Sequence, residues 1–366
     1  MKMFDIIRAA LFTPTPWGWG LPILVTGAPG EGKSSVAAAV CEATSMPYVL
    51  LSPGETGEAY FGAVPAVTGG VIDYPRPGWT DEVAVGGAVI VDEIRTAPII
   101  IRPALLGLTL DRRVGGHSLG RDVAVIALSN SAEDSPNGLP LDPPQANRFV
   151  HISWGEMTGA ETGAVVCRQL TSGGRVVPEG GSSWVALRKE MLERAPAVMA
   201  EVGAMIEQFL AENQQWARRR PAEGEGDGPW PSPRSWALAG CGIAAARLHG
   251  LGESGERLFG AGAVGAAAYA ALRAWAMYRG LPSASALVSG GVWHGVAAAR
   301  SDQVAYVLDG VVALTTDTTA DYVINLLLDW SQWHREIVAA KIAALIPSHR
   351  GALMTATIRR CAAVLG

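Results

Sequence analysis

The feature that most constrains this chain is the segment GAPGEGKS at residues 27–34, which follows a short apolar run and precedes an alanine-rich stretch. It satisfies the pattern GxxxxGK[ST] in the order strand, loop, helix that this pattern requires. Its glycines let backbone N–H groups point inward around phosphate oxygens, and the helix that follows adds the positive end of its dipole. The segment therefore predicts a phosphate-binding loop.

The residues of this loop have predicted places around a bound nucleotide. Lys33 would reach the β- and γ-phosphates, and the Ser34 hydroxyl would ligate Mg²⁺. We therefore expect ATP and Mg²⁺ as the cofactors. The predicted nucleotide-binding residues are Gly27, Ala28, Pro29, Gly30, Glu31, Gly32, Lys33, Ser34 and Ser35.

Two further apolar runs end in polar side chains. The first, Ala88 to Val91, is followed by Asp92 and Glu93, and the second begins at Val123 and ends at Asn130. Central parallel strands place functional residues at their carboxyl ends, so these side chains are expected to meet near the phosphate. Asp92 would hold Mg²⁺ and Glu93 would polarise the attacking water, which predicts hydrolysis as well as binding. Asn130 would point toward the γ-phosphate and this water.

Two arginines are candidate catalytic residues. Arg148 follows PLDPPQAN, and it is either a surface residue or a side chain that reaches across a subunit boundary to a neighbour's γ-phosphate. Arg234 follows Ser232 and Pro233 at a predicted helix start, where a cation opposes the helix dipole unless an anion lies nearby. An ATP phosphate would supply that anion.

The order of these motifs resembles a known family. The segments GAPGEGKS, VDEIRTAP, ALLGLTLDRRV, VIALSN, PLDPPQANRF and PSPRSW are similar to those of MoxR-type AAA+ ATPases, ring-forming motors that remodel partner proteins. The resemblance covers roughly residues 20–283. It implies that Asn130 is sensor 1, Arg148 the arginine finger and Arg234 sensor 2. It also implies a pore-side hairpin within residues 61–79 and a second hairpin within residues 112–122.

The chain departs from the family pattern at three places. Asn147 stands where an acidic residue usually precedes the finger arginine, and residues 131–134 replace the usual segment after sensor 1. Arg95 and Thr96 stand where the family usually has Asn and Arg.

The chain is 366 residues long, with 49% hydrophobic and 17% charged residues, so most of it should fold. We expect an α/β fold, a P-loop NTPase core with a central parallel sheet, followed by an all-α lid and a helical extension. Residues 182–217 are predicted to form one long helix and residues 258–272 one buried helix too short to span a membrane. The predicted divisions are a core at 1–220, a linker at 221–232, a lid at 233–283 and an extension at 284–366.

These features predict an ATP-hydrolysing remodelling motor that acts on a partner protein as a homo-oligomer, a hexameric ring. The resemblance implies a partner with a von Willebrand factor A domain. A net charge of −5 argues against nucleic acid as the principal partner, and four dispersed cysteines fit a reducing cytoplasm. No signal peptide or membrane segment is expected, and the protein substrate is not identified.

Two other functions stay open. One is a switch or scaffold that binds ATP with negligible turnover. The other is a DNA-acting motor of the helicase type, whose hairpins carry basic residues into the pore. Arg76 is the only Lys or Arg between Phe61 and Trp79, which disfavours the helicase.

Overall fold

The structure is a computed structural model that divides into two compact units, Met1–Leu272 and Arg273–Gly366. The boundary falls inside helix α9 (Ala266–Tyr278). The described residues are 2–62, 64–131, 134, 139–155, 158–159, 162–163, 167, 183–221 and 226–365.

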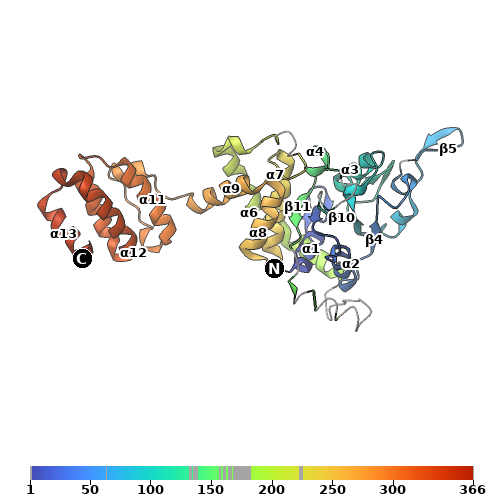
Figure 1. The fold of residues 1–366 in the computed structure, drawn as a ribbon, viewed down its shortest axis with the longest axis horizontal. Helices are drawn as coiled ribbons and strands as arrows, with labels where there is room; N and C mark the ends of the chain where they lie inside the picture. Colours follow the sequence, from blue (N-terminus) through green and yellow to red (C-terminus); the bar gives the residue numbers. More distant parts are fainter. Residues whose placement is uncertain are drawn as a thin grey trace. The chain divides into compact units, whose positions relative to one another are not determined.

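The first unit is built on a five-stranded parallel sheet with the strand order β11-β3-β10-β7-β4 (Figure 1). Its strands are β3 (Ile23–Thr26), β4 (Tyr48–Leu51), β7 (Gly87–Val91), β10 (Val123–Ser129) and β11 (Val150–Ser153). Every residue of β7 and β10 is buried, as expected for central strands covered on both faces. The three strands predicted from apolar runs are confirmed as β3, β7 and β10, and the edge strands β4 and β11 were missed.

Helices cover the sheet on both faces. Helix α2 packs near β7 and contacts α1, α3 packs against β10, and α7 and α8 lie against the edge strand β11 (Figure 1). The helices of this part are α1 (Met3–Leu11), α2 (Lys33–Ala43), α3 (Arg102–Asp111), α4 (Pro143–Ala146), α6 (Trp184–Glu212), α7 (Pro233–Leu248) and α8 (Gly252–Val264). This arrangement confirms the predicted α/β phosphate-loop core followed by a helical region.

Three short antiparallel hairpins join these elements. The first lies next to the N-terminal helix, and the other two fall within the two segments expected to form hairpins. They are β1 (Pro14–Thr15) with β2 (Gly18–Trp19), β5 (Ala66–Thr68) with β6 (Val71–Asp73), and β8 (Arg113–Val114) with β9 (His117–Ser118). Single 3-10 turns complete this part at η1 (Glu58–Phe61), η2 (Gly78–Asp81), η3 (Ile94–Thr96) and η4 (Gln214–Trp216).

Two helix predictions differ from the structure. The long helix α6 ends at Glu212, and Asn213, with φ −132°, separates it from the short turn η4. The predicted helix over residues 258–272 is broken at Gly265, whose φ of +86° lies in the left-handed region and separates α8 from α9. The alanine-rich composition of this stretch concealed the break.

The second unit is entirely helical among its described residues. Its elements are the end of α9, α10 (Ala284–Val288), η5 (Val296–Ala298), α11 (Ser301–Leu314), α12 (Ala320–His349), η6 (Arg350–Ala352) and α13 (Thr355–Leu365). Its core gathers aliphatic side chains of α11 and α12 around Trp330. Helix α12 is kinked at His334, which has a non-helical backbone and whose Nε2 lies 2.8 Å from the Val296 carbonyl oxygen.

Among the helices that the structure describes, none is both long enough and apolar enough to cross a bilayer.

Arg112 joins the sheet to the elements beside it. It is 2% exposed, follows α3 with a φ of +52°, and its guanidinium donates to four backbone carbonyls. Nε donates to Val123 O at 2.7 Å, Nη2 donates to Trp19 O at 3.0 Å and to Gly20 O at 3.3 Å, and Nη1 donates to Thr109 O. Burial lowers the pKa of Arg112 to about 10. One side chain therefore holds together the end of α3, the β2 hairpin and the start of β10.

We expect Arg112→Met to lower the free energy of unfolding by about 3 kcal/mol, because it leaves buried carbonyl oxygens without donors. In a unit of this size that corresponds to a melting temperature lower by roughly 6–12 °C. Thermal unfolding monitored by circular dichroism measures it. Arg113→Met is the matched control, since Arg113 is exposed in β8 and its Nη2 donates to Gly116 O at 3.5 Å, which is the side chain's one hydrogen bond among the described residues. Equal melting temperatures for the two variants would contradict this role.

Candidate functional site

The loop between β3 and α2 has the backbone that a phosphate cradle needs. Gly30 and Gly32 have φ of +82° and +79°, and a Cβ at either position would meet nothing within 4 Å. Glycine is favoured at both positions because the backbone is in the left-handed region, and the space beside each Cα is open. Gly27 is required by packing, because its Cβ would lie 2.5 Å from the Trp154 Cβ.

The first turn of α2 is available to an anion. Its N-cap Gly32 provides no side-chain cap, and the turn contains no acidic residue. Helix N-termini without such caps leave backbone N–H groups for an anionic ligand. The predicted loop residues Pro29 and Ser35 are exposed beside this turn.

Lys33 is the centre of the site. Its side chain is buried, and Nζ donates to Gly27 O at 3.0 Å, to Ala28 O at 2.8 Å and to Asn130 Oδ1 at 2.9 Å. Burial lowers the pKa of Lys33, and the negative charges of Glu93, Asp92, Glu31 and Asp134 oppose that shift. The structure thus places the predicted phosphate-binding cation among acidic groups at the carboxyl ends of the strands.

Ser34 and Asp92 lie together as predicted for a metal site. The Ser34 hydroxyl donates to Asp92 Oδ2 at 2.5 Å. Two hydrogen bonds hold Asp92 in place. Its backbone N–H donates to Leu51 O of β4 at 2.7 Å, and its side-chain Oδ1 accepts from the Glu93 N–H at 3.0 Å. A hydroxyl and a carboxylate at this separation are hard oxygen ligands, and the pair fits Mg²⁺ bound between the loop and β7.

Asn130 connects the loop to Glu93. Its Oδ1 accepts from Lys33 Nζ, and its Nδ2 donates to Glu93 Oε1 at 2.7 Å. One amide therefore bridges the cation and the carboxylate, which is possible because β10 lies between β3 and β7 in the sheet. The sequence predicted that Asn130 lies near the phosphate, and it did not predict this bridge.

Glu93 has a constrained backbone and a carboxylate oxygen without a partner. Its φ of +51° is in the left-handed region, and its carbonyl accepts from both the N–H and the hydroxyl of Thr96, at 2.9 and 2.8 Å. Glu93 Oε2 is buried and makes no hydrogen bond among the described residues. Backbone strain and an unsatisfied buried oxygen are both typical of functional sites.

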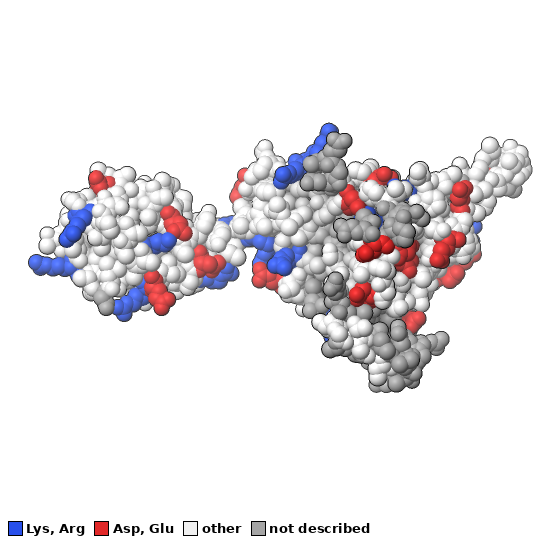
Figure 2. All heavy atoms as spheres, in the orientation of Figure 1, with Lys and Arg blue, Asp and Glu red and all other residues white. Residues whose placement is uncertain are grey.

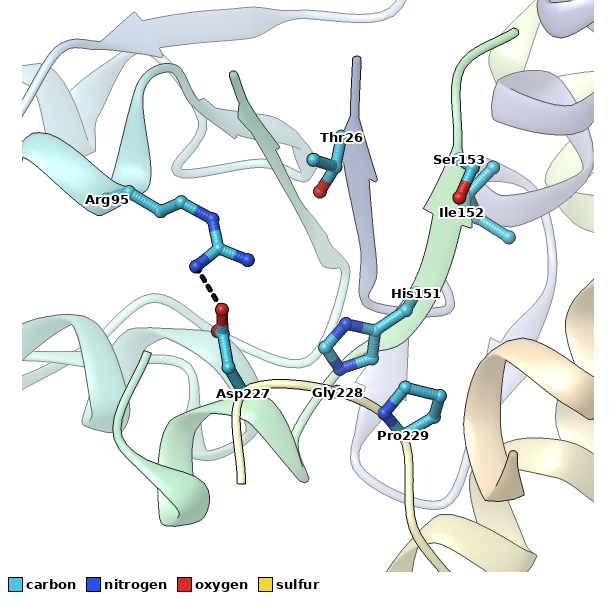
Figure 3. Close-up of a pocket in the computed structure, with 8 residues that line it drawn as sticks. All are labelled: Thr26, Arg95, His151, Ile152, Ser153, Asp227, Gly228 and Pro229. Atoms are coloured by element: carbon cyan, nitrogen blue, oxygen red, sulfur yellow. Dashed lines mark hydrogen bonds and ion pairs between the residues drawn. The ribbon is translucent and has the colours of Figure 1, made fainter. Parts of the chain in front are cut away.

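A pocket of about 360 Å³ adjoins the start of the loop. Figure 3 shows Thr26 of β3 and residues 151–153 of β11 on one side, with the segment 227–229 on the other. Arg95 and Asp227 point toward one another there, with 2.5 Å between Nη1 and Oδ2 (Figure 3). The sequence analysis noted Arg95 only as a departure and missed Asp227, and a separation of 132 residues gave no signal of their contact.

Arg148 and Arg234 lie near one another. Burial lowers the pKa of Arg148, and the positive charge of Arg234 lowers it further. Arg148 Nη1 donates to Pro144 O at 2.9 Å, and its buried Nε has no partner among the described residues. Nearby, Ser232 Oγ donates to Asn147 Oδ1 at 2.8 Å, which joins the start of α7 to the end of α4. In the described part of the chain, neither arginine hydrogen-bonds to Lys33, Asp92, Glu93 or Asn130.

Comparisons with known proteins add little to this geometry. No family model matches the chain, and no curated protein matches it. Among solved structures, a protein from Cytophaga hutchinsonii described as a "putative ATPase" is similar, with 14% identity and a TM-score of 0.46 over 72% of this chain and 80% of that one.

Proposed function

We propose that this chain is an ATPase of the MoxR type within the AAA+ proteins, and that it remodels a partner protein as a ring of identical subunits. The observation that carries the proposal is the connected set of Lys33, Asn130 and Glu93 beside Ser34 and Asp92. These are the groups that phosphoryl-transfer sites use to hold phosphate, metal and water.

Lys33 would exchange partners when ATP binds. In the structure its Nζ donates to two loop carbonyls and to Asn130, and phosphate oxygens are stronger acceptors than any of these neutral groups. Mg²⁺ held by Ser34 and Asp92 would neutralise charge on the β- and γ-phosphate oxygens. The uncapped N-terminus of α2 would donate backbone N–H groups to the same phosphates.

Glu93 would orient the attacking water. Its Oε2 is an unpaired acceptor, while Asn130 holds the other oxygen of the same carboxylate. A carboxylate fixed at one oxygen can accept a proton from water at the other, and it stays positioned while doing so. The backbone of Glu93, tied to Thr96, would keep the side chain directed at the reacting phosphate.

The two arginines support an active site shared between subunits. Arg148 and Arg234 lie close together, and among the described residues neither hydrogen-bonds to the Lys33 group of its own chain. Two neighbouring cations, one of which has a buried Nε without a partner among the described residues, favour an anion from outside. We assign that anion as the nucleotide of the neighbouring subunit in a ring, which we propose to be a hexamer.

The β5–β6 hairpin supports a protein as the substrate of the ring. Figure 1 shows it projecting from the first unit, and Figure 2 shows an uncharged tip. Val67, Val71 and Ile72 are 74%, 66% and 71% exposed. On the face drawn, patches of acidic side chains lie on the surface beside this hairpin (Figure 2). An apolar hairpin fits a protein surface better than a phosphate backbone. A protein with a von Willebrand factor A domain remains our proposed partner.

Mixing two inactive variants tests the shared site. Glu93→Gln removes the water-orienting carboxylate, and Arg148→Ala removes the arginine, with turnover expected to fall by about 10³-fold for the latter. In a ring, an Arg148→Ala subunit beside a Glu93→Gln subunit forms one complete site. In an equal mixture, about half of the subunits supply Glu93, and about half of their neighbours supply Arg148. About a quarter of the interfaces are then complete, so phosphate release should recover to about a quarter of the wild-type rate.

The matched control is the Glu93→Gln, Arg148→Ala double variant mixed with each single variant, which can form no complete site. Because Arg234 lies beside Arg148, Arg234→Ala should be rescued by Glu93→Gln in the same way. A mixture that stays at the level of the separate variants would contradict the shared site, and it would leave hydrolysis within one chain as the alternative.

A further inference from the structure

We propose that the ion pair between Arg95 and Asp227 links Glu93 to the helix that carries Arg234, and that Asp227 is a positioning residue for ATP hydrolysis. The proposal rests on the proposed function. Asp227 lies in the segment that leads into α7, and Arg95 follows Glu93 by two residues. The link runs from Glu93 along the chain to Arg95, across the ion pair to Asp227, and then along residues 227–232 to α7.

The first part of the link is short and stiff. Arg95 lies in the single turn η3, whose backbone is tied to the Glu93 carbonyl by the N–H and the hydroxyl of Thr96. The Arg95 side chain is only 7% exposed. Movement of Arg95 would therefore be passed to the Glu93 backbone, which already has a left-handed conformation.

Both carboxylate oxygens of Asp227 are used. Oδ2 accepts from Arg95 Nη1 at 2.5 Å, and Oδ1 accepts from the Leu141 N–H at 2.8 Å. The neighbouring Gly226 lies so close to Pro143 that a Cβ would be 2.6 Å from the proline Cγ. Asp227 thus fixes its segment between η3 and the region of α4.

The ion pair adds to these contacts a direct connection between this segment and η3. The pocket of about 360 Å³ is lined by residues 227–229, by the ends of β3 and β11 and by Arg95 (Figure 3). Figure 3 shows the ion pair spanning from the η3 side to this segment. Because Arg95 follows Glu93 by two residues, the Arg95–Asp227 pair contributes to the position of this segment relative to Glu93.

The last part of the link fixes the start of α7. The Trp230 carbonyl accepts from Ser235 Oγ at 2.7 Å, and Ser232 caps the helix through reciprocal hydrogen bonds with Ser235. Ser232 Oγ also donates to Asn147 Oδ1. Arg234 lies in this first turn, so the position of its backbone depends on the segment that Asp227 holds.

The test is Asp227→Asn in the full chain. Asparagine keeps the shape and an acceptor for the Leu141 N–H, but it removes the charge that Arg95 needs. We expect kcat for ATP to fall by about 10-fold, since small displacements of catalytic groups cost about this much or more. The affinity for ATP should stay within about twofold, because the phosphate-loop contacts are unchanged.

A double-mutant cycle separates this link from a general loss of stability. We expect Arg95→Gln to lower kcat by a similar factor, and the double variant to be no worse than either single one. Asp122→Asn is the matched control, since it removes a similar pair, Arg188–Asp122 at 2.6 Å, in the same unit. It should leave kcat unchanged.

Hydrogen exchange on the wild-type chain is a second test that needs no substitution. Adding ATP should slow amide exchange in residues 226–235. Unchanged kcat in a folded Asp227→Asn variant, additive effects in the cycle, or no response of residues 226–235 to ATP would each overturn the link. If the wild-type chain still hydrolyses ATP in these cases, the link fails and the proposed function stands. If the wild-type chain shows no turnover, the proposed function itself is contradicted.

Discussion

Replacing Lys33 by alanine lowers the affinity for ATP by about a hundredfold. Nζ of Lys33 is the one described cation bonded to the loop carbonyls and to Asn130, and its charge is already surrounded by Glu93, Asp92 and Glu31. Without it, the phosphates would enter an acidic site in which Mg²⁺ alone would offset their charge. Hydrogen bonds to charged groups are worth about 1.5–3 kcal/mol, which corresponds to roughly ten- to more than a hundredfold in a binding constant. Isothermal titration with ATP and Mg²⁺ measures the loss.

Lys189→Ala is the control for this measurement. Lys189 is exposed on α6, and its replacement by alanine also removes one positive charge. It should bind ATP as the wild type does. The thermal stabilisation that ATP gives the wild type should also disappear in Lys33→Ala, since a ligand stabilises only the state that binds it. Equal affinities for the wild type and Lys33→Ala would show that the nucleotide binds elsewhere.

Replacing Glu93 by glutamine stops turnover and leaves ATP bound. The amide retains the shape of the side chain, but it cannot accept a proton from the attacking water, and general-base contributions are typically 10²- to 10⁴-fold. We therefore expect kcat to fall by about 10³-fold. The Kd for ATP should change by less than about threefold, because Lys33, Ser34 and the α2 N-terminus are unaltered. Single-turnover measurements of phosphate release distinguish the chemical step from product release.

Glu190→Gln is the matched control, since Glu190 pairs with Arg194 on the exposed surface of α6. Turnover by Glu93→Gln at the wild-type rate would contradict the role of Glu93. Turnover lost together with ATP binding would also contradict it, because the carboxylate would then be needed for the loop itself.

The sequence identified the parts of the site that are contiguous in the chain. Gly27 to Ser35, Asp92 and Glu93 could be predicted because each follows an apolar strand directly, and parallel strands bring their ends to one edge. Asn130 was predicted by the same rule. The bridge it forms depends on strand order, which puts β10 between β3 and β7 and which no single segment encodes.

The parts that were missed depend on packing across long separations. The edge strands β4 and β11 are only partly buried and become recognisable once β7 and β3 are available to pair with them. Asp227 lies in a stretch rich in Gly and Pro that resembled a linker, and its contact with Arg95 exists only in the folded chain. Arg112 was expected to lie in a hairpin, and only the structure shows it buried against four carbonyls.

The sequence motifs did not predict that Arg148 and Arg234 lie near one another in the folded chain. The sequence predicted a phosphate near each arginine, and it gave no indication that the two would share one location. The long helix α6 lies between β11 and α7 in the chain and contacts α7, so it contributes to where α7 begins relative to the sheet.

Mg²⁺-dependent phosphate release by the wild-type full-length chain tests the central claim most directly. We expect one phosphate to be released for each ADP formed, with the activity abolished by chelating Mg²⁺ and by Glu93→Gln. A chain that binds ATP through Lys33 and forms no ADP, alone or with a protein partner, would contradict hydrolysis and establish a nucleotide-dependent switch instead.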